Sequence, residues 1–300
     1  MRAAGWMCDM ATPGQWIEGA RPRTLPAAIA PVLAGTGVAA FNHSEVWWKA
    51  ALAMVVALAL QVGVNYANDY SDGIKGTDAD RVGPLRLVGS GSAAASQVKV
   101  AAFASFGVAA VAGVALALTT SWWLVALGAV SIVAAWYYTG GSRPYGYAGL
   151  GEVMVFVFFG LVAVLGTTYV QAEQLPLPAW YCAIGIGALA SAILVANNLR
   201  DIPTDKVANK LTLAVRLGDQ RTRALYVFML VGAAIALVGI SMSTSAWAAL
   251  GFAFLAPATK AIRTVRSGAV GHDLVKVLQL TGAAELLYGL GVFAGLLIAS

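Results

Sequence analysis

Long stretches of apolar residues run through almost the whole of this 300-residue chain. They are about 17–23 residues long, which lets an α-helix cross the hydrocarbon core of a bilayer and is too long for the strands of a membrane barrel. Of all residues, 59% are hydrophobic and only 11% are charged, about half the charged fraction of an average soluble domain. Because backbone groups in lipid must be hydrogen-bonded within the protein, the sequence predicts an all-α, polytopic membrane protein.

The apolar segments predict nine membrane-spanning helices in a single domain, residues 1–300, without a separate soluble part. The predicted spans are 25–41, 48–66, 98–119, 122–138, 151–170, 179–197, 224–242, 245–259 and 279–299. Three longer polar stretches remain, which are a tail at 1–24 and connections at 67–97 and 198–223. Chemistry that needs water-soluble groups is expected in these stretches.

The basic residues divide very unequally between the two sides that nine spans create. All of the 19 Lys and Arg residues except Lys49 fall on the side that holds the N-terminus. Since cytoplasmic loops are enriched in Lys and Arg, this predicts a cytoplasmic N-terminus, a C-terminus outside and a place in the cell inner (plasma) membrane. The net charge of +5 therefore indicates membrane topology; membrane lipid is the expected surrounding partner, and no nucleic acid is expected.

Asn and Asp residues gather where the second span ends. The cluster contains Asn65, Asn68, Asp69, Asp72 and Asp78. At helical spacing Asn65, Asp69 and Asp72 share a face. Asn68 and Asp72 are one turn apart. Carboxylates this close repel one another unless a cation lies between them, and Mg²⁺ takes oxygen ligands from side chains, water and phosphate.

A second cluster, Asn197, Asp201 and Asp205, follows the sixth span with steps of four residues. Two acidic clusters, each at the end of an apolar segment, predict two Mg²⁺-binding jaws that close on a diphosphate. The alternative is that each cluster is a helix end followed by a solvated polar loop. The sequence has few acids elsewhere, and this favours the paired site.

These residues resemble the two motifs of the UbiA-type intramembrane prenyltransferases, and the resemblance covers nearly the whole chain. The first motif is similar to residues 65–73 with 81–91, and the second to 197–205 with 210–218. Residues 20–26 and 138–146 resemble the branch of that superfamily acting on 1,4-dihydroxy-2-naphthoate in menaquinone biosynthesis. The resemblance implies helices around a central lipid-accessible cavity, with Mg²⁺ bridging a polyprenyl diphosphate.

The implied reaction transfers a polyprenyl group from polyprenyl diphosphate to 1,4-dihydroxy-2-naphthoate, with loss of CO₂ and diphosphate, giving demethylmenaquinone. The chain departs from the family pattern in two places. The superfamily's first pattern has a third Asp four residues after Asp72, where this chain has Gly76; Asp78 is expected to substitute. Pro203 lies inside the second motif and predicts a break in the helix, because Pro removes a backbone donor.

The resemblance and the side-chain chemistry together assign candidate roles. The predicted metal ligands are Asn68, Asp69, Asp72, Asp78, Asp201 and Asp205. The predicted catalytic residues are Asp69, Asp72, Asp201, Asp205, Lys75, Tyr138 and Glu152. The predicted substrate-binding residues are Asn65, Asn68, Arg21, Arg81, Arg143, Tyr145, Asn197, Lys206 and Lys210.

Each class of side chain has a chemical role and a structural alternative. Basic groups neutralise diphosphate, and a guanidinium can hold the acceptor's carboxylate with two hydrogen bonds; their alternative is topology signalling. Tyrosine rings stabilise a prenyl cation by about 0.5–2 kcal/mol each, or form an interfacial belt. Glu152, an acid within a predicted span, is a base, a Lys partner or a paired structural acid. The segment Gly89–Ser92 is a lid hinge or an ordinary loop.

Two other functions are compatible with parts of the pattern. An ion-coupled transporter would place acids near the middle of spans and on both sides of the bundle, whereas nearly all Asp residues here lie on one side. Within the enzymes, the alternative is a prenyltransferase for another phenolic acceptor, such as 4-hydroxybenzoate or a homogentisate-like phenol.

Overall fold

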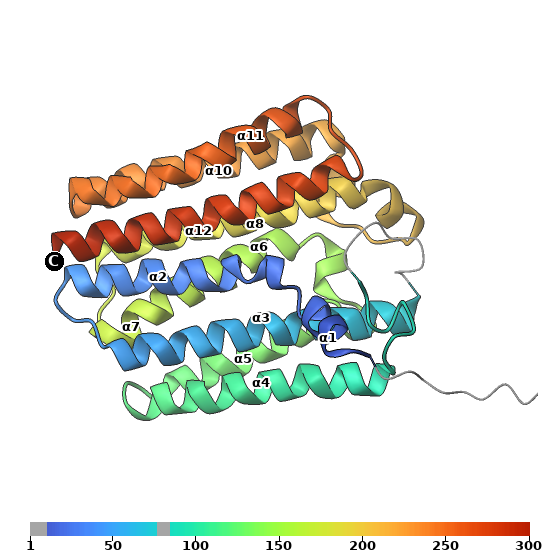
Figure 1. Ribbon diagram of the computed structural model, residues 1–300, viewed down its shortest axis with the longest axis horizontal. Helices are drawn as coiled ribbons and strands as arrows, with labels where there is room; N and C mark the ends of the chain where they lie inside the picture. Colours follow the sequence, from blue (N-terminus) through green and yellow to red (C-terminus); the bar gives the residue numbers. More distant parts are fainter. Residues whose placement is uncertain (1–10, 77–84) are drawn as a thin grey trace, which may run out of the picture.

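A computed structural model describes residues 11–76 and 85–300, and the regular elements in these ranges are all helical. The long helices lie roughly side by side (Figure 1). In chain order the elements are α1 Pro13–Gly19, η1 Pro22–Thr24, α2 Pro26–Phe41, α3 Trp47–Lys75, α4 Ala95–Leu118, α5 Trp123–Tyr137, η2 Tyr145–Ala148, α6 Gly151–Val155, η3 Phe156–Leu165, α7 Gly166–Ala172, α8 Leu177–Val207, α9 Leu213–Leu217, α10 Asp219–Ser243, η4 Ala246–Phe254, α11 Leu255–Arg266 and α12 Asp273–Ala299.

The architecture is that of an all-α polytopic membrane protein. Within the described residues, six helices are long and apolar enough to cross a bilayer: α3, α4, the continuous stretch Gly151–Ala172, α8, α10 and α12. The bent pair Pro13–Thr24 and Pro26–Phe41, with 50° between its parts, gives a seventh. Helix α5 is apolar but shorter. The prediction of a helical membrane protein is confirmed, and the predicted count of nine spans is not.

Two helices continue well past the predicted ends of their spans. The second predicted span ended at 66 and the sixth at 197, yet α3 continues to Lys75 and α8 to Val207. The described residues of both acidic clusters therefore lie in the C-terminal turns of long helices, and the connections at 67–97 and 198–223 begin as helix. The predicted spans ended where polar residues begin, because hydropathy indicates where a segment leaves the lipid. A helix can continue beyond that point.

The predicted break at Pro203 was wrong, because α8 runs through it. A proline inside a helix removes one hydrogen bond and crowds the preceding turn. Around it Leu199, Asp201 and Ile202 are buried, and the Thr204 hydroxyl donates to the backbone oxygen of Asp201 (3.0 Å). Packing of the buried face offsets the local cost and keeps the last turns helical.

Helix α8 is the central element of the larger core. Of its most apolar stretch, 72% is buried, against 28–44% in the other spans. It packs against α10, α12, α2 and η3, while α3, α4 and α5 form a second group on the other side of α2 (Figure 1). The acid-bearing ends of α3 and α8 lie at the same end of the bundle (Figure 1), which brings the two clusters to one face.

Close approach of α12 to η4 gives a test of this packing. A Cβ atom built on Gly291 would lie 2.5 Å from the backbone oxygen of Leu250 and 2.6 Å from the Cα atom of Gly251. Gly291→Ala is expected to lower the midpoint of thermal unfolding in detergent, since overpacking costs about 1–3 kcal/mol. Gly232→Ala on α10, where nothing lies within 4 Å, is the matched control. Equal midpoints for both variants would contradict this packing.

Candidate active site

A cavity of about 330 Å³ lies among α2, α3, α4, α5 and the stretch Gly151–Ala172, within the range of about 300–1,000 Å³ typical of ligand sites. Most of its lining is apolar, and α3 contributes the amides Gln61, Asn65 and Asn68. Tyr138 and Tyr145 line it as well. The cavity suits a ligand with a hydrophobic chain and one polar end. The polar end would lie near the amides in the C-terminal part of α3.

One wall of the cavity has unusual backbone geometry. Element η3 is a π-helix, a rare conformation that is found frequently at functional sites. On one side Gly160 packs against Gly187 of α8, where a built Cβ would lie 2.7 Å from the Gly187 Cα atom. On the other side Phe158 and Phe159 line the cavity. The close contact with α8 and the broadened turns together present aromatic rings to the cavity.

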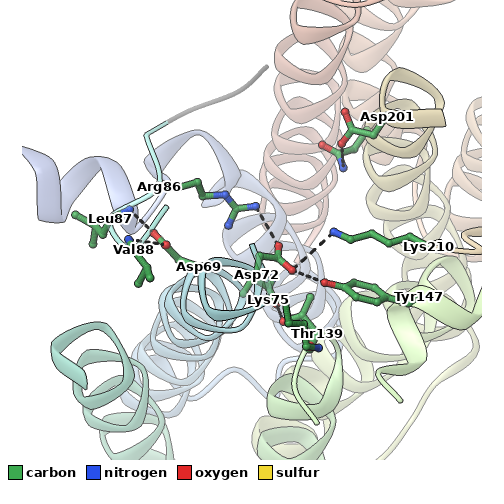
Figure 2. A network of polar contacts seen from close by, with 12 residues as sticks. Asp69, Asp72, Lys75, Arg86, Leu87, Val88, Thr139, Tyr147, Asp201 and Lys210 are labelled. Carbon is green, nitrogen blue, oxygen red and sulfur yellow. Dashed lines mark hydrogen bonds and ion pairs between the residues drawn. The ribbon is translucent and has the colours of Figure 1, made fainter. Parts of the chain in front are cut away.

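Asp72 is the centre of the polar network at the end of α3 (Figure 2). Its side chain is almost completely buried. Its Oδ2 atom lies 3.5 Å from Nη2 of Arg86, and its Oδ1 atom lies 3.8 Å from Nζ of Lys210. The phenol of Tyr147 donates a short hydrogen bond to Oδ1. Three segments that are distant in sequence therefore meet at one carboxylate.

Two lysines flank the ring of Tyr147. Nζ of Lys75 lies 5.1 Å from the ring centroid and Nζ of Lys210 lies 4.5 Å from it, both within cation–π range. Lys75 also donates to the backbone oxygen of Thr139 (2.6 Å). The predicted diphosphate-binding lysines Lys75 and Lys210 thus lie together on the Asp72 side, and Tyr147 links them.

Asn68 lies one turn before Asp72 and its Oδ1 atom accepts a hydrogen bond from the Thr139 hydroxyl (2.7 Å). Asn65 is placed differently, since its Nδ2 atom donates to the backbone oxygen of Ala20 (2.8 Å) and to Oγ1 of Thr24 (2.9 Å). Asn65 therefore fastens the segment before α2 to α3, and it also lines the cavity.

Asp201 of the second cluster lies across from Asp72, on α8 (Figure 2). Arg200 holds the Asp201 carboxylate with Nε–Oδ1 and Nη2–Oδ2 contacts of 2.6 and 2.8 Å. Asn197 Nδ2 lies 3.4 Å from Asp201 Oδ2, and Oδ2 of Asp205 accepts from Thr212 (3.4 Å). Asn197, Asp201 and Asp205 follow one another at steps of four residues on the unbroken helix α8, so they lie on one side of it.

Asp69, unlike Asp72, points away from this space. Its oxygens accept the backbone N–H groups of Leu87 and Val88, and Figure 2 shows it pointing toward them. Arg21, a predicted binder of the acceptor's carboxylate, interacts electrostatically with Asp69. The sequence placed Asp69 with Asp72 because spacing fixes the helical face but not the direction of the side chain.

Glu152 is buried near the start of α6, and its Oε1 atom accepts from Asn198 Nδ2 (2.9 Å). Its Oε2 atom is buried and has no hydrogen-bond partner among the described residues. The sequence predicted Glu152 only as an acid within a span; the structure adds its contact with the second motif through Asn198. Its link to Asn198 ties α6 to the same turn of α8 that carries Asn197.

The remaining predicted residues are less closely joined to the network. Arg143 and Lys206 are exposed, and Asp78 and Arg81 lie outside the described residues. Tyr138 and Tyr145 make an edge-to-face pair with ring centroids 5.5 Å apart. Tyr145 also donates to the backbone oxygen of Ala134 (2.8 Å), and burial raises its pKa to about 12.

The sequence interpretation missed several residues of the network, namely Arg86, Thr139, Tyr147 and Arg200. Arg86 and Arg200 lie inside segments that resemble family motifs, and Tyr147 follows such a segment directly. Their position in the motifs was a usable signal. Their contacts with Asp72, Asn68 and Asp201 required coordinates.

Metal binding was tested against the donor atoms. In residues 11–76 and 85–300, no three Asp, Glu, His or Cys side chains lie close enough to hold an ion by themselves. Mg²⁺ usually takes one or two carboxylates and completes its shell with water and substrate phosphates. Asn68 with Asp72, and Asp201 with Asp205, are donor sets of that size, and both suit a Mg²⁺ that also binds diphosphate.

Comparison with known proteins gives a consistent result. The chain matches the UbiA prenyltransferase family over residues 28–271. It is 56% identical to the 1,4-dihydroxy-2-naphthoate octaprenyltransferase of Mycobacterium tuberculosis, with 96% of this chain and 98% of that protein covered. It is 37% identical to the enzyme of the same name from Escherichia coli, with 93% and 94% covered.

Solved structures share the fold at low sequence identity. A UbiA homologue from Aeropyrum pernix K1 superposes with a TM-score of 0.71 at 14% identity, covering 89% of this chain and 97% of that one. A UbiA homologue from Archaeoglobus fulgidus, bound to GPP and Mg²⁺, gives 0.67 at 13% identity, covering 93% and 99%.

The raised pKa of Tyr145 predicts a pH dependence of stability. Burial favours the neutral phenol, so this stabilisation is complete below about pH 10, the ordinary tyrosine value, and is lost as pH rises through about 12. Tyr145→Phe is expected to lose less stability than the wild type across this window in detergent unfolding experiments. Tyr137→Phe, at an exposed tyrosine, is the control and should follow the wild type. Parallel curves for Tyr145→Phe and the wild type would contradict the prediction.

Proposed function

The chain belongs to the UbiA prenyltransferase family, and we propose that it transfers a polyprenyl group from polyprenyl diphosphate to 1,4-dihydroxy-2-naphthoate. Diphosphate and CO₂ leave, and the product is the quinol form of demethylmenaquinone. The observation that carries this proposal is the buried carboxylate of Asp72, surrounded by Arg86, Lys210 and Tyr147 close to an apolar cavity. Near full-length identity of 56% to a naphthoate octaprenyltransferase supports the acceptor.

Mg²⁺ is the proposed cofactor. Asn68 and Asp72 would hold it on the α3 side, and Asp201 and Asp205 on the α8 side; Asp78 stays a predicted ligand outside the described residues. When bound, Mg²⁺ would offset the negative charge that grows on the departing diphosphate and hold that group in place. Diphosphate oxygens and water would complete its ligand shell.

The basic residues have a defined part in the same step. Breaking the allylic C–O bond leaves the electron pair on the diphosphate and a positive charge on the prenyl carbon. Arg86, Lys75 and Lys210 bind diphosphate oxygens, because hydrogen bonds from cations strengthen as that charge grows. Their contacts with Asp72 and with the ring of Tyr147 keep them near the cavity before substrate arrives. Arg81 and Lys206 are further proposed contacts.

The cavity protects the prenyl cation. Its apolar lining excludes water, which would otherwise capture the cation as an alcohol. The rings of Tyr138 and Tyr145 stand at the cavity and stabilise positive charge by about 0.5–2 kcal/mol each. Because Tyr145 remains protonated, its hydroxyl keeps the hydrogen bond to Ala134 that orients the ring.

The prenyl group replaces the carboxylate, which leaves as carbon dioxide, so the acceptor loses no proton overall. A phenol proton that is removed as the ring attacks returns to the oxygen in the quinol product. Glu152 is the proposed base, since its second oxygen is buried and has no hydrogen-bond partner among the described residues. Arg21 and Arg143 are the proposed holders of the acceptor's carboxylate, and Asn197 is a further substrate contact. The prenyl group forms its new bond at the carbon that the carboxylate leaves.

Membrane topology completes the proposal. We infer nine spans around a lipid-accessible cavity, with the N-terminus cytoplasmic, the C-terminus outside, and the protein in the cell inner membrane. The excess of Lys and Arg on the N-terminal side supports this orientation. The two acidic helix ends then face the cytoplasm, where soluble diphosphate and the acceptor are exchanged.

Product analysis tests the acceptor. Purified protein is incubated with octaprenyl diphosphate, Mg²⁺ and either 1,4-dihydroxy-2-naphthoate or 4-hydroxybenzoate, and lipids are analysed by mass spectrometry. We expect a prenylated naphthoquinol that lacks the carboxylate, with labelled carboxyl carbon recovered as CO₂. Transfer to 4-hydroxybenzoate alone would replace the proposed acceptor, and transfer to neither would overturn the proposed reaction.

Removal of a carboxylate or of the metal tests the two-sided site. Asp201→Asn is expected to lower transfer about a hundredfold or more, the scale of losing a contact with developing charge, while the protein still folds. Asp273→Asn, an exposed acid of the first turn of α12, is the control and should keep its activity. EDTA should abolish transfer and Mg²⁺ restore it. Transfer that resists chelation would exclude the metal.

A further inference from the structure

The carboxylate of Asp69 is turned away from the other acids of the site. The side chain is 1% exposed, and its oxygens accept the backbone N–H groups of Leu87 (2.7 Å) and Val88 (3.1 Å). Figure 2 shows Asp69 pointing to these residues, whereas Asp72 points to the bases on the other side. Both amides belong to the segment Leu85–Ser92 before α4, called loop 85–92 below.

Loop 85–92 packs closely against α1 and α3; this packing site of Leu87 and Val88 is called the seat of the loop below. The Leu87 side chain is completely buried, and a Cβ atom built on Gly19 would lie 2.7 Å from its Cδ1 atom. A Cβ atom built on Gly73 of α3 would lie 2.6 Å from the Cβ atom of Val88. Glycine at both positions allows the loop to approach α1 and α3 this closely. The seat fixes the two residues that Asp69 holds.

Backbone hydrogen bonds also connect residues of the loop to one another. Fixing the amides of Leu87 and Val88 therefore also restricts the residues next to them. The N–H of Ser90 donates to the backbone oxygen of Arg86 (2.9 Å), and the N–H of Ala93 donates to that of Leu87 (3.0 Å). Arg86 precedes the held amides directly, and its Nη2 atom lies 3.5 Å from Oδ2 of Asp72. The position of this guanidinium therefore depends on the backbone that Asp69 anchors.

A metal ion would have to compete with this arrangement. Turning the Asp69 carboxylate toward Mg²⁺ would remove the acceptors of two backbone donors. The hydrogen bond from Leu87 is buried, and leaving such a donor unpaired costs about 1–3 kcal/mol. Both oxygens of the Asp69 carboxylate are therefore already occupied by backbone donors.

We propose that Asp69 is a positioning residue, which anchors loop 85–92 and so holds Arg86 beside Asp72, and that it is not a Mg²⁺ ligand. This revises the metal role that the sequence pattern assigned to Asp69. The functional part rests on the proposed function, in which Arg86 binds diphosphate oxygens. The structural part, the anchoring of the loop, stands independently of the reaction.

Asp69→Asn is the principal test, because it keeps the shape of the side chain and turns one acceptor oxygen into an amino group facing a backbone donor. Deuterium uptake in a peptide covering loop 85–92 should rise, and kcat should fall by about tenfold, the scale of a supporting residue. The Mg²⁺ concentration giving half-maximal activity should stay unchanged. Asp201→Asn is the contrast, since it should lose activity without altering exchange in the loop.

Two further variants separate anchoring from a general loss of structure. Gly73→Ala disturbs the seat of Val88 without changing any charge, and it should reproduce both the faster exchange and the lower kcat. In a double-mutant cycle, Asp69→Asn should add little to the loss caused by Arg86→Gln, because both remove the same guanidinium contact. Additive losses would show that Asp69 does not act through Arg86.

A metal role for Asp69 predicts a different pattern. The half-maximal Mg²⁺ concentration would then rise by about tenfold or more, with exchange in loop 85–92 unchanged, and this result would overturn the proposal. If the wild type transfers no prenyl group to the naphthoate, the proposed function fails. Exchange in Asp69→Asn and Gly73→Ala still decides whether Asp69 anchors the loop.

Discussion

A carboxylate buried at the end of an apolar bundle is tolerated only where cations and hydrogen-bond donors surround it. Asp72 receives them from three segments: Arg86 before α4, Tyr147 in η2 and Lys210 after α8. Each segment is thereby held at the same end of the cavity. The rest of the site depends on this charge balance, because the groups that stabilise Asp72 are those that a diphosphate would meet.

Both acidic helix ends hold a carboxylate against basic side chains. Asp72 lies near Arg86 and Lys210, and Arg200 holds Asp201 in the same way on α8. In the proposed reaction a diphosphate with Mg²⁺ would bring negative and positive charge together, so these side chains would exchange partners while their charges stay paired. Buried ion pairs of this kind position charged groups more than they stabilise the fold.

The sequence predicted the all-α membrane fold class, and it named many of the polar residues that the structure places near the ends of α3 and α8; their roles stay predictions. Those predictions depend on hydropathy and on the spacing of residues along the chain. Both relate directly to structure through the regular geometry of the helical backbone. Side-chain direction was not predictable in this way. Asn68, Asp69 and Asp72 occupy neighbouring positions on one helix, yet they bind Thr139, a loop backbone and a group of bases, respectively. Pro203 shows the same limit, since burial around it outweighs a local preference.

The polar network lies at one end of α3, and the cavity extends beside the apolar part of that helix. A substrate with a charged head and an apolar tail would therefore contact two different environments at once, the polar network at its head and the apolar cavity along its tail. Once the bond between head and tail is cut, each piece already lies in the medium that dissolves it. Diphosphate partitions into water and the alkylated ring into the bilayer, so phase preference itself separates the products.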